Sequence, residues 1–156
     1  MAKQFDGKPT RLYTLTRPDL TTHNEFIWVP SETYTFPGTG ELCTSGWAHA
    51  YPSAALALFL NPIHANYHPY RLWEAVGVVG ASDCGLKVGC STLRLEREVP
   101  IPTVTAEHRV TFAILCALAA DQPPAFAAWA ESWLAGRNKT AAAAAAAWAA
   151  EAGAAA

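Results

Sequence analysis

Cysteine and histidine are the residue types in this 156-residue sequence that could do chemistry most directly. Cys43 and His49 are six positions apart, and so are Cys84 and Cys90, so a tetrahedral zinc site with three cysteines and one histidine can be drawn. Structural zinc modules, however, separate paired cysteines by only about two to four residues. We therefore expect no metal site, and we expect Cys90 and Cys116 to pack as small hydrophobic side chains.

Known catalytic and phosphate-binding motifs are absent from the sequence. Cys43, Cys84 and Ser53 are candidate nucleophiles, with His49 as a possible base, but neither a Gly-x-Ser-x-Gly elbow nor a cysteine-protease signature surrounds them. Neither a P-loop nor a dinucleotide-binding fingerprint occurs in the glycine-rich stretch 77–89. The sequence therefore leaves the catalytic residues unknown and favours a protein that is not an enzyme.

Four polar residues among large apolar ones are the candidate ligand-binding residues: His49, Glu74, Asp83 and Lys87. If these side chains lie inside, each must be paired, because an unpaired buried charge is expensive. A converging cluster of the four would form the natural pocket, in which Lys87 could meet an anionic ligand. The alternative is that all four side chains point outward and are solvated.

The elements that must position these residues change character along the chain. Up to about residue 99, short alternating stretches bounded by proline and glycine predict strands. A run of helix formers predicts one short helix, which begins at Pro52 and ends at Asn61-Pro62. The expected strands cover residues 11–16, 25–29, 33–36, 46–50, 71–79 and 86–99, the last with a bulge or a bend.

After about residue 103 the pattern predicts two helices. Thr105 can cap the first, which is expected to run to about Ala120. The second begins at Pro123-Pro124 and is closed by Gly136. The predicted apolar faces consist of Val110, Ala113, Ile114, Ala117 and Leu118 in the first helix, and of Phe126, Trp129, Ala130, Trp133 and Leu134 in the second.

Together these elements predict an α+β fold. We expect a twisted, mostly antiparallel sheet with one short helix, and a C-terminal helix pair packed on one sheet face. Residues 1–137 are expected to form a single domain. Residues 138–156 form an alanine-rich, low-complexity tail for which helix is the expected conformation.

Composition narrows the classes of function. Only 15% of residues are charged and the net charge is −2, so generic nucleic-acid binding is not expected, while binding to a partner or self-association is favoured. No apolar run is long enough to span a bilayer, and the first residues lack the apolar stretch of a secretory signal. We therefore expect a cytoplasmic protein without a membrane partner.

Several sequence blocks resemble a group of tailed-bacteriophage proteins that end in alanine-rich tails. They are residues 42–51, 60–65, 71–74, 85–90 and 112–118. The resemblance covers most of residues 8–137. It implies a viral protein acting in the host cytoplasm, but no mechanism.

A weaker resemblance is to the ADP-ribosyltransferase fold. Residues 12–17 are similar to its first strand, residues 46–50 to its second motif and residues 72–77 to the next strand. The sequence departs from that pattern at Thr14, where many members have histidine, and at Ala48, where they have tyrosine. The resemblance implies binding of NAD or a related nucleotide in a degenerate pocket.

Two functions follow as expectations. The first is a non-enzymatic phage accessory protein that binds a host or defence component and needs no cofactor. The alternative is a nucleotide- or NAD-binding protein, an ADP-ribosyl-type transferase if it is an enzyme, which would use His49, Glu74 and Lys87.

Overall fold

The computed structural model describes residues 6–120 and 123–140 of the chain. By packing, the chain divides into two compact units, Met1–Thr103 and Val104–Ala156, and each is described by itself. Within the described ranges, no helix is both long enough and apolar enough to cross a membrane.

The first unit is built on a five-stranded sheet in which every pair of strands is antiparallel. The path runs β1-β4-β5-β2, and β3 also pairs with β5. The long hairpin of β4 and β5 carries the register shifts expected of a bulged, bent ladder. The strands are β1 (Pro9–Thr16), β2 (Thr33–Thr35), β3 (Ala48–Ala50), β4 (Arg71–Asp83) and β5 (Lys87–Glu98). The expected α+β class with an antiparallel sheet is thus confirmed.

The sheet closes on itself at one point. The Tyr13 amide donates to the Tyr51 carbonyl, and the Tyr51 amide donates to the Tyr13 carbonyl, both at 2.8 Å. Tyr51 directly follows β3, so this bridge joins β3 to β1 and closes the circuit β1-β4-β5-β3.

The core of this unit lies on the inner face of the closed circuit. Ala48 and Ala50 of β3 point into it because alternate residues of a strand share a face. Trp28 and Trp73 supply the largest buried surfaces and satisfy their indole N–H groups, Trp28 on Thr22 Oγ1 at 2.9 Å and Trp73 on Thr16 Oγ1 at 3.1 Å. The buried members are Leu12, Trp28, Ala48, Ala50, Trp73, Ala75, Val88, Cys90, Leu93 and Leu95.

The strand expected at residues 25–29 is wrong. His23–Glu25 forms a short 3-10 turn instead, and both Asn24 (φ 57°) and Glu25 (φ 56°) have left-handed backbone that an extended strand excludes. Beyond the turn, the Trp28 amide donates to the Leu20 carbonyl at 3.0 Å, so the segment folds back on its own loop. Burial of the Trp28 ring determines this path, and alternation in the sequence does not encode it.

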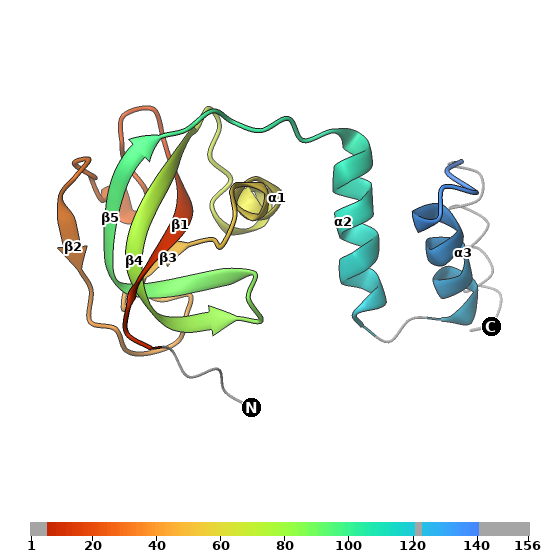
Figure 1. Ribbon diagram of the computed structural model, residues 1–156, viewed down its shortest axis with the longest axis horizontal. Coiled ribbons are helices and arrows are strands. Elements are labelled where there is room, and N and C mark those ends of the chain that lie inside the picture. The colour runs from red at the N-terminus through yellow and green to blue at the C-terminus, as the bar shows by residue number, and fades with distance from the viewer. Residues whose placement is uncertain (1–5, 121–122, 141–156) are drawn as a thin grey trace. The chain divides into compact units, whose positions relative to one another are not determined.

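Helix α1 (Ala54–His64) is capped by Ser53, whose hydroxyl accepts from the Leu56 amide, and lies against β1 (Figure 1). The expected end at Asn61-Pro62 is wrong, because the helix continues through Pro62 to His64. Asn61 is buried, and its side chain donates to the Tyr67 carbonyl and accepts from the Tyr67 amide, each at 3.0 Å. This pair of hydrogen bonds ties the last turn of the helix to the segment that follows it.

The second unit contains α2 (Ala106–Leu118) and α3 (Pro124–Leu134). Thr105 caps α2 as expected, and Gly136 follows α3 with a left-handed φ of 77°. The expected apolar faces meet in a small core of Ile114, Phe126, Ala130 and Trp133.

Two expectations for this unit fare differently. Val110, expected on the apolar face of α2, is 41% exposed, and Leu134, expected on that of α3, is 37% exposed, so both faces are narrower than their periodicity suggests. That the helix pair packs on a face of the sheet stays a prediction, as does a single domain over residues 1–137. The tail from Ala141 onward lies outside the described residues.

Candidate functional site

A strap formed by residues 38–46 lies over the β4-β5 hairpin and is anchored by Trp47. The Trp47 indole packs on the backbone of Gly80 and Gly89, where an added Cβ would come within 2.6 Å and 2.9 Å of the ring. Its Nε1 donates to the Gly40 carbonyl at 3.1 Å, and the Gly38 amide donates to the Gly46 carbonyl at 2.8 Å. The two glycines of the hairpin thus provide the flat surface against which Trp47 packs and holds the strap.

The strap places Cys43 on Lys87. Lys87 is only 5% exposed, and its Nζ donates to Cys43 Sγ at 3.0 Å. Burial of an ammonium group is costly unless it is paired, yet no carboxylate in the described part of the chain forms an ion pair with it. The Cys43 thiol therefore accepts a hydrogen bond from a buried amine.

Three ring side chains lie near enough to this contact for Lys87 or Cys43 to affect their pKa values: His49, Tyr51 and His64. His49 lies opposite Gly89 in the register and therefore on the same face as Lys87. Its Nε2 is bound to the Leu42 carbonyl. The Tyr51 hydroxyl lies 3.1 Å from His64 Nδ1, and the two rings are stacked.

Burial and the nearby amine control the protonation of these rings. Burial lowers the pKa of His49, and the charge of Lys87 lowers it further, against the opposing effect of the Leu42 carbonyl. Burial also raises the pKa of Tyr51 to about 12. At neutral pH both rings are uncharged, so Lys87 has no anionic neighbour among them.

The structure brings only part of the predicted set together. His49 and Lys87 are neighbours, and Asp83 stands opposite Lys87 at the base of the hairpin turn, but Asp83 is exposed and no ion pair joins the two in the described chain. Glu74 lies nine residues from Asp83 along β4, up to about 30 Å away. It is held there by Arg11 at 3.7 Å and by Arg97 at 2.9 Å. The four residues therefore do not line one cavity.

The cysteines are dispersed. Cys90 is buried in the core, where burial raises its pKa to about 12, and Cys43, Cys84 and Cys116 are exposed. Cys116 therefore does not pack as the buried hydrophobe expected from the sequence. Among the described residues, no three His, Cys, Asp or Glu side chains come together as a metal-ion site.

A groove of about 420 Å³ opens beside β1, where the closed circuit leaves a gap before the Tyr13–Tyr51 bridge. Its floor is apolar and belongs to the core. Lys8 and Arg11 supply two cations at its rim. One carboxylate, that of Asp6, also lies at the rim. The lining residues are Asp6, Lys8, Thr10, Arg11, Leu12, Pro52, Val79, Ser82, Gly85 and Val88.

The backbone of β1 is also free in this groove. Tyr13 directs its N–H and C=O toward Tyr51, and alternate residues of an antiparallel strand direct these groups to the same side. Arg11 therefore points its N–H and C=O into the groove, where no strand pairs with it in the described part of the chain. Nothing in the sequence marked Lys8 or Arg11 as functional, because the groove arises from the closure of the sheet.

A second cavity, of about 480 Å³, lies between residues 17–19 and 65–69. Its polar groups are already used internally. The Arg17 guanidinium donates to Thr21 Oγ1 and to the Thr22 carbonyl and stacks over Tyr67. Asp19 accepts from the amide and the hydroxyl of Thr21, and these hydrogen bonds lower its pKa. We interpret this cavity as structural.

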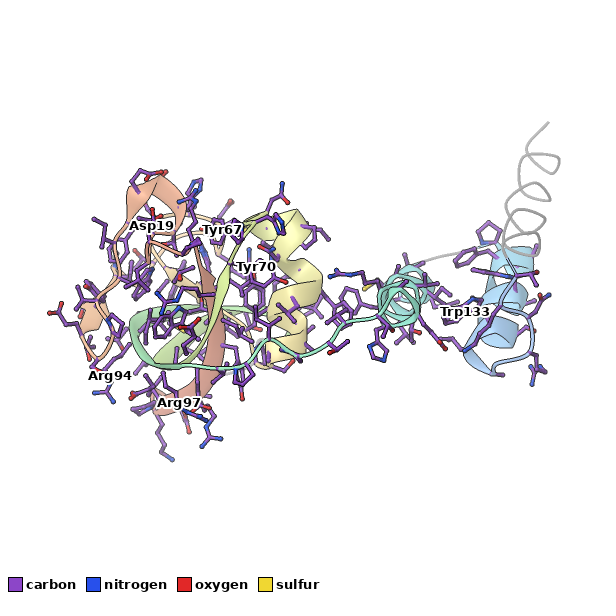
Figure 2. The ribbon with its side chains drawn as sticks, turned by 90° about the horizontal axis from the view of Figure 1, so that it is seen from above. Asp19, Tyr67, Tyr70, Arg94, Arg97 and Trp133 are labelled. Atoms are coloured by element: carbon purple, nitrogen blue, oxygen red, sulfur yellow. The ribbon has the colours of Figure 1, made fainter. Side chains whose placement is uncertain are left out.

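Figure 2 locates this cavity in the first unit. It shows Asp19 and Tyr67 toward the same end of the unit, away from Arg94 and Arg97.

The positions that carry the likeness to ADP-ribosyltransferases lie in the interior. Thr14 is 6% exposed and donates its hydroxyl to the His49 carbonyl at 3.2 Å, and Ala48 is 3% exposed within the core. Neither side chain lines the two cavities described above. Those positions therefore supply no contact for a nucleotide in either cavity.

Comparisons of the chain with protein-family models, with curated proteins and with solved structures find no match.

Proposed function

We propose that this protein is a binding module for a small anionic ligand with a flat apolar part, of the nucleotide class, and that the ligand occupies the groove beside β1. The observation that carries the proposal is the combination of an apolar floor with the cations Lys8 and Arg11 at its rim. A volume of about 420 Å³ lies in the range typical of small-molecule sites.

The groove has an apolar part and a cationic part, which match the base and the phosphates of a nucleotide. Leu12, Val79 and Val88 offer an apolar surface to a base. The exposed ammonium of Lys8 and the guanidinium of Arg11 are suited to phosphate oxygens. Their present partners are weak, because Lys8 lies 3.5 Å from Asp6 and Arg11 lies 3.7 Å from Glu74, with both cations largely in solvent.

A peptide strand is less well suited to this edge than a small ligand. Pro9 points to the same side as Arg11 but has no N–H to donate, and the nearby charges of Lys8 and Arg11 discourage strand pairing. Only one free backbone N–H in this stretch, that of Arg11, remains for an added strand. The same N–H suits a single phosphate or ribose oxygen.

Calorimetry of the full chain against ATP, GTP, NAD, ADP-ribose and cyclic nucleotides tests the proposal. We expect at least one of these to bind and Arg11→Gln to weaken its affinity by roughly 10-fold, since a hydrogen bond to a charged group contributes about 1.5–3 kcal/mol. Lys8→Gln should act in the same direction, and binding should weaken with salt.

Arg94→Gln is the matched control. Arg94 is a partly exposed arginine of the same sheet, paired with Glu96, and it does not line the groove. The proposal would be overturned if no nucleotide of the panel binds, or if Arg94→Gln and Arg11→Gln weaken the affinity equally.

The expectation that the chain binds a host or defence macromolecule stays a prediction. Two apolar side chains of the loop before β2 are largely exposed, Ile27 at 63% and Val29 at 45%, and they are the place where such a partner would bury apolar surface.

A further inference from the structure

The contact between Lys87 and Cys43 lies outside the groove, and what we infer from it is independent of the proposed function. The two residues are 44 positions apart, and their Nζ and Sγ atoms are 3.0 Å apart. The lysine is 5% exposed, whereas the cysteine is exposed. A small oxidant can therefore reach the sulfur while the amine is held beneath it.

The surroundings of this pair hold the two atoms in place. Lys87 stands on the paired backbone of β5, and the strap that carries Cys43 is fixed by the bond between His49 and the Leu42 carbonyl. The Trp47 ring on Gly80 and Gly89 fixes the other end of the strap. An amine and a thiol held together in this way react as an intramolecular pair.

We propose that Cys43 and Lys87 form an oxidation-dependent covalent cross-link, an S–N bond between Cys43 Sγ and Lys87 Nζ, when the protein meets a peroxide. The link would staple the strap to β5 and would be reversed by thiols.

The reaction balances with one peroxide. The Cys43 sulfur attacks hydrogen peroxide, the O–O bond breaks, and sulfenic acid and one water form, so that the thiol is oxidised by two electrons and the peroxide is reduced. The Lys87 ammonium releases one proton to solvent water, and the lone pair that this frees on Nζ then attacks Sγ. The S–N bond forms, the S–O bond breaks, and the hydroxide leaves with the amine proton as a second water. Sulfenic acids condense with backbone nitrogen in the same way.

The test uses the full chain carrying Cys84→Ser and Cys116→Ser, because a disulfide to either exposed cysteine would also remove two hydrogens. The reduced protein is treated with stoichiometric hydrogen peroxide, denatured, alkylated and analysed by intact mass and by peptide mapping. We expect a species lighter by two hydrogens, a peptide pair joined through Cys43 and Lys87, and recovery of the reduced mass with dithiothreitol.

Two further measurements complete the test. Lys87→Arg keeps the positive charge but removes the nucleophilic amine, so Cys43 should then carry only oxygen adducts. The cross-linked protein should also melt higher than the reduced one, by on the order of 5 °C or more, since the link closes a long loop.

Oxygen adducts on Cys43 with Lys87 unmodified, in the chain that retains Lys87, would overturn the proposal. That outcome does not depend on whether the Lys87→Arg variant folds. It is also separate from the nucleotide experiments, because neither residue lines the groove.

Discussion

At the scale of single residues, burial determines the protonation state of the polar side chains around β3. His49 shows this most clearly. Its ring is held neutral by desolvation and by the nearby amine of Lys87, and Nε2 is bound to the Leu42 carbonyl. Protonation of this ring in the folded protein would place a second charge beside Lys87, and this gives the stability a pH dependence that can be measured.

We predict that His49 makes the protein less stable as the pH falls below about 6.5. Burial holds the pKa of His49 in the folded state below the ordinary histidine value of 6.5, so the unfolded chain binds the proton first and acid favours unfolding. Above that pH the ring is neutral in both states and contributes no pH dependence.

Thermal melts of the wild type, His49→Gln and His68→Gln between pH 7 and pH 5 measure this effect. His49→Gln keeps a donor for Leu42 and should lose less stability over this range than the wild type. His68 is an exposed histidine, so its variant should follow the wild type. Equal slopes for His49→Gln and the wild type would show that His49 does not carry the dependence.

At the scale of elements, the strap over the hairpin is the contact on which the polar cluster depends. Trp47 lies on two strands at once, through Gly80 of β4 and Gly89 of β5. Because a Cβ at either position would overlap the ring, the absence of side chains there is a packing requirement rather than a matter of backbone conformation.

We predict that Gly80→Ala destabilises the protein by about 1–3 kcal/mol, the usual cost of overpacking a filled site. Its Cβ would come within 2.6 Å of Trp47 Cζ3, so the ring and the strap must shift. Urea denaturation measures the change in the free energy of unfolding.

A double-mutant cycle with Trp47→Phe supplies the control. The smaller ring leaves room for the methyl group, so Gly80→Ala should cost less in the Trp47→Phe background than in the wild type. Additive effects of the two substitutions would mean that the ring and the glycine do not interact.

At the scale of the whole molecule, the first unit carries its own core and a hydrogen-bonded circuit of strands. Every member of that core lies before Thr103, the last residue of the unit. The unit therefore contains the interactions that a small domain needs to fold by itself.

We predict that a chain ending at Thr103 folds. Its circular dichroism should be that of a β-rich protein, and it should melt in one cooperative transition. An unfolded fragment would contradict this and would instead favour the prediction that the helix pair packs on the sheet and completes its core.

The sequence by itself determined the elements whose signals are local. Alternation at residues 11–16 marked β1, and Thr105 with Gly136 marked the limits of the helix pair. The stretch 80–85 was expected to separate the two long strands, and the hairpin is there, but β4 extends to Asp83 rather than ending at Val79. The sequence signals failed at residues 25–29, where the Trp28 ring is buried by a loop, and at Pro62, through which the helix continues to His64.

Only the tertiary structure decided where chemistry is possible. The groove is lined by residues that β1, β4 and β5 bring together, and the amine of Lys87 meets Cys43 across 44 positions of chain. No local sequence pattern predicts either feature. Each depends on strand register and on the closure of the sheet, and these result from many weak interactions between distant segments. For the same reason Glu74, predicted beside His49 and Lys87, lies instead with Arg11 and Arg97 toward the far end of β4.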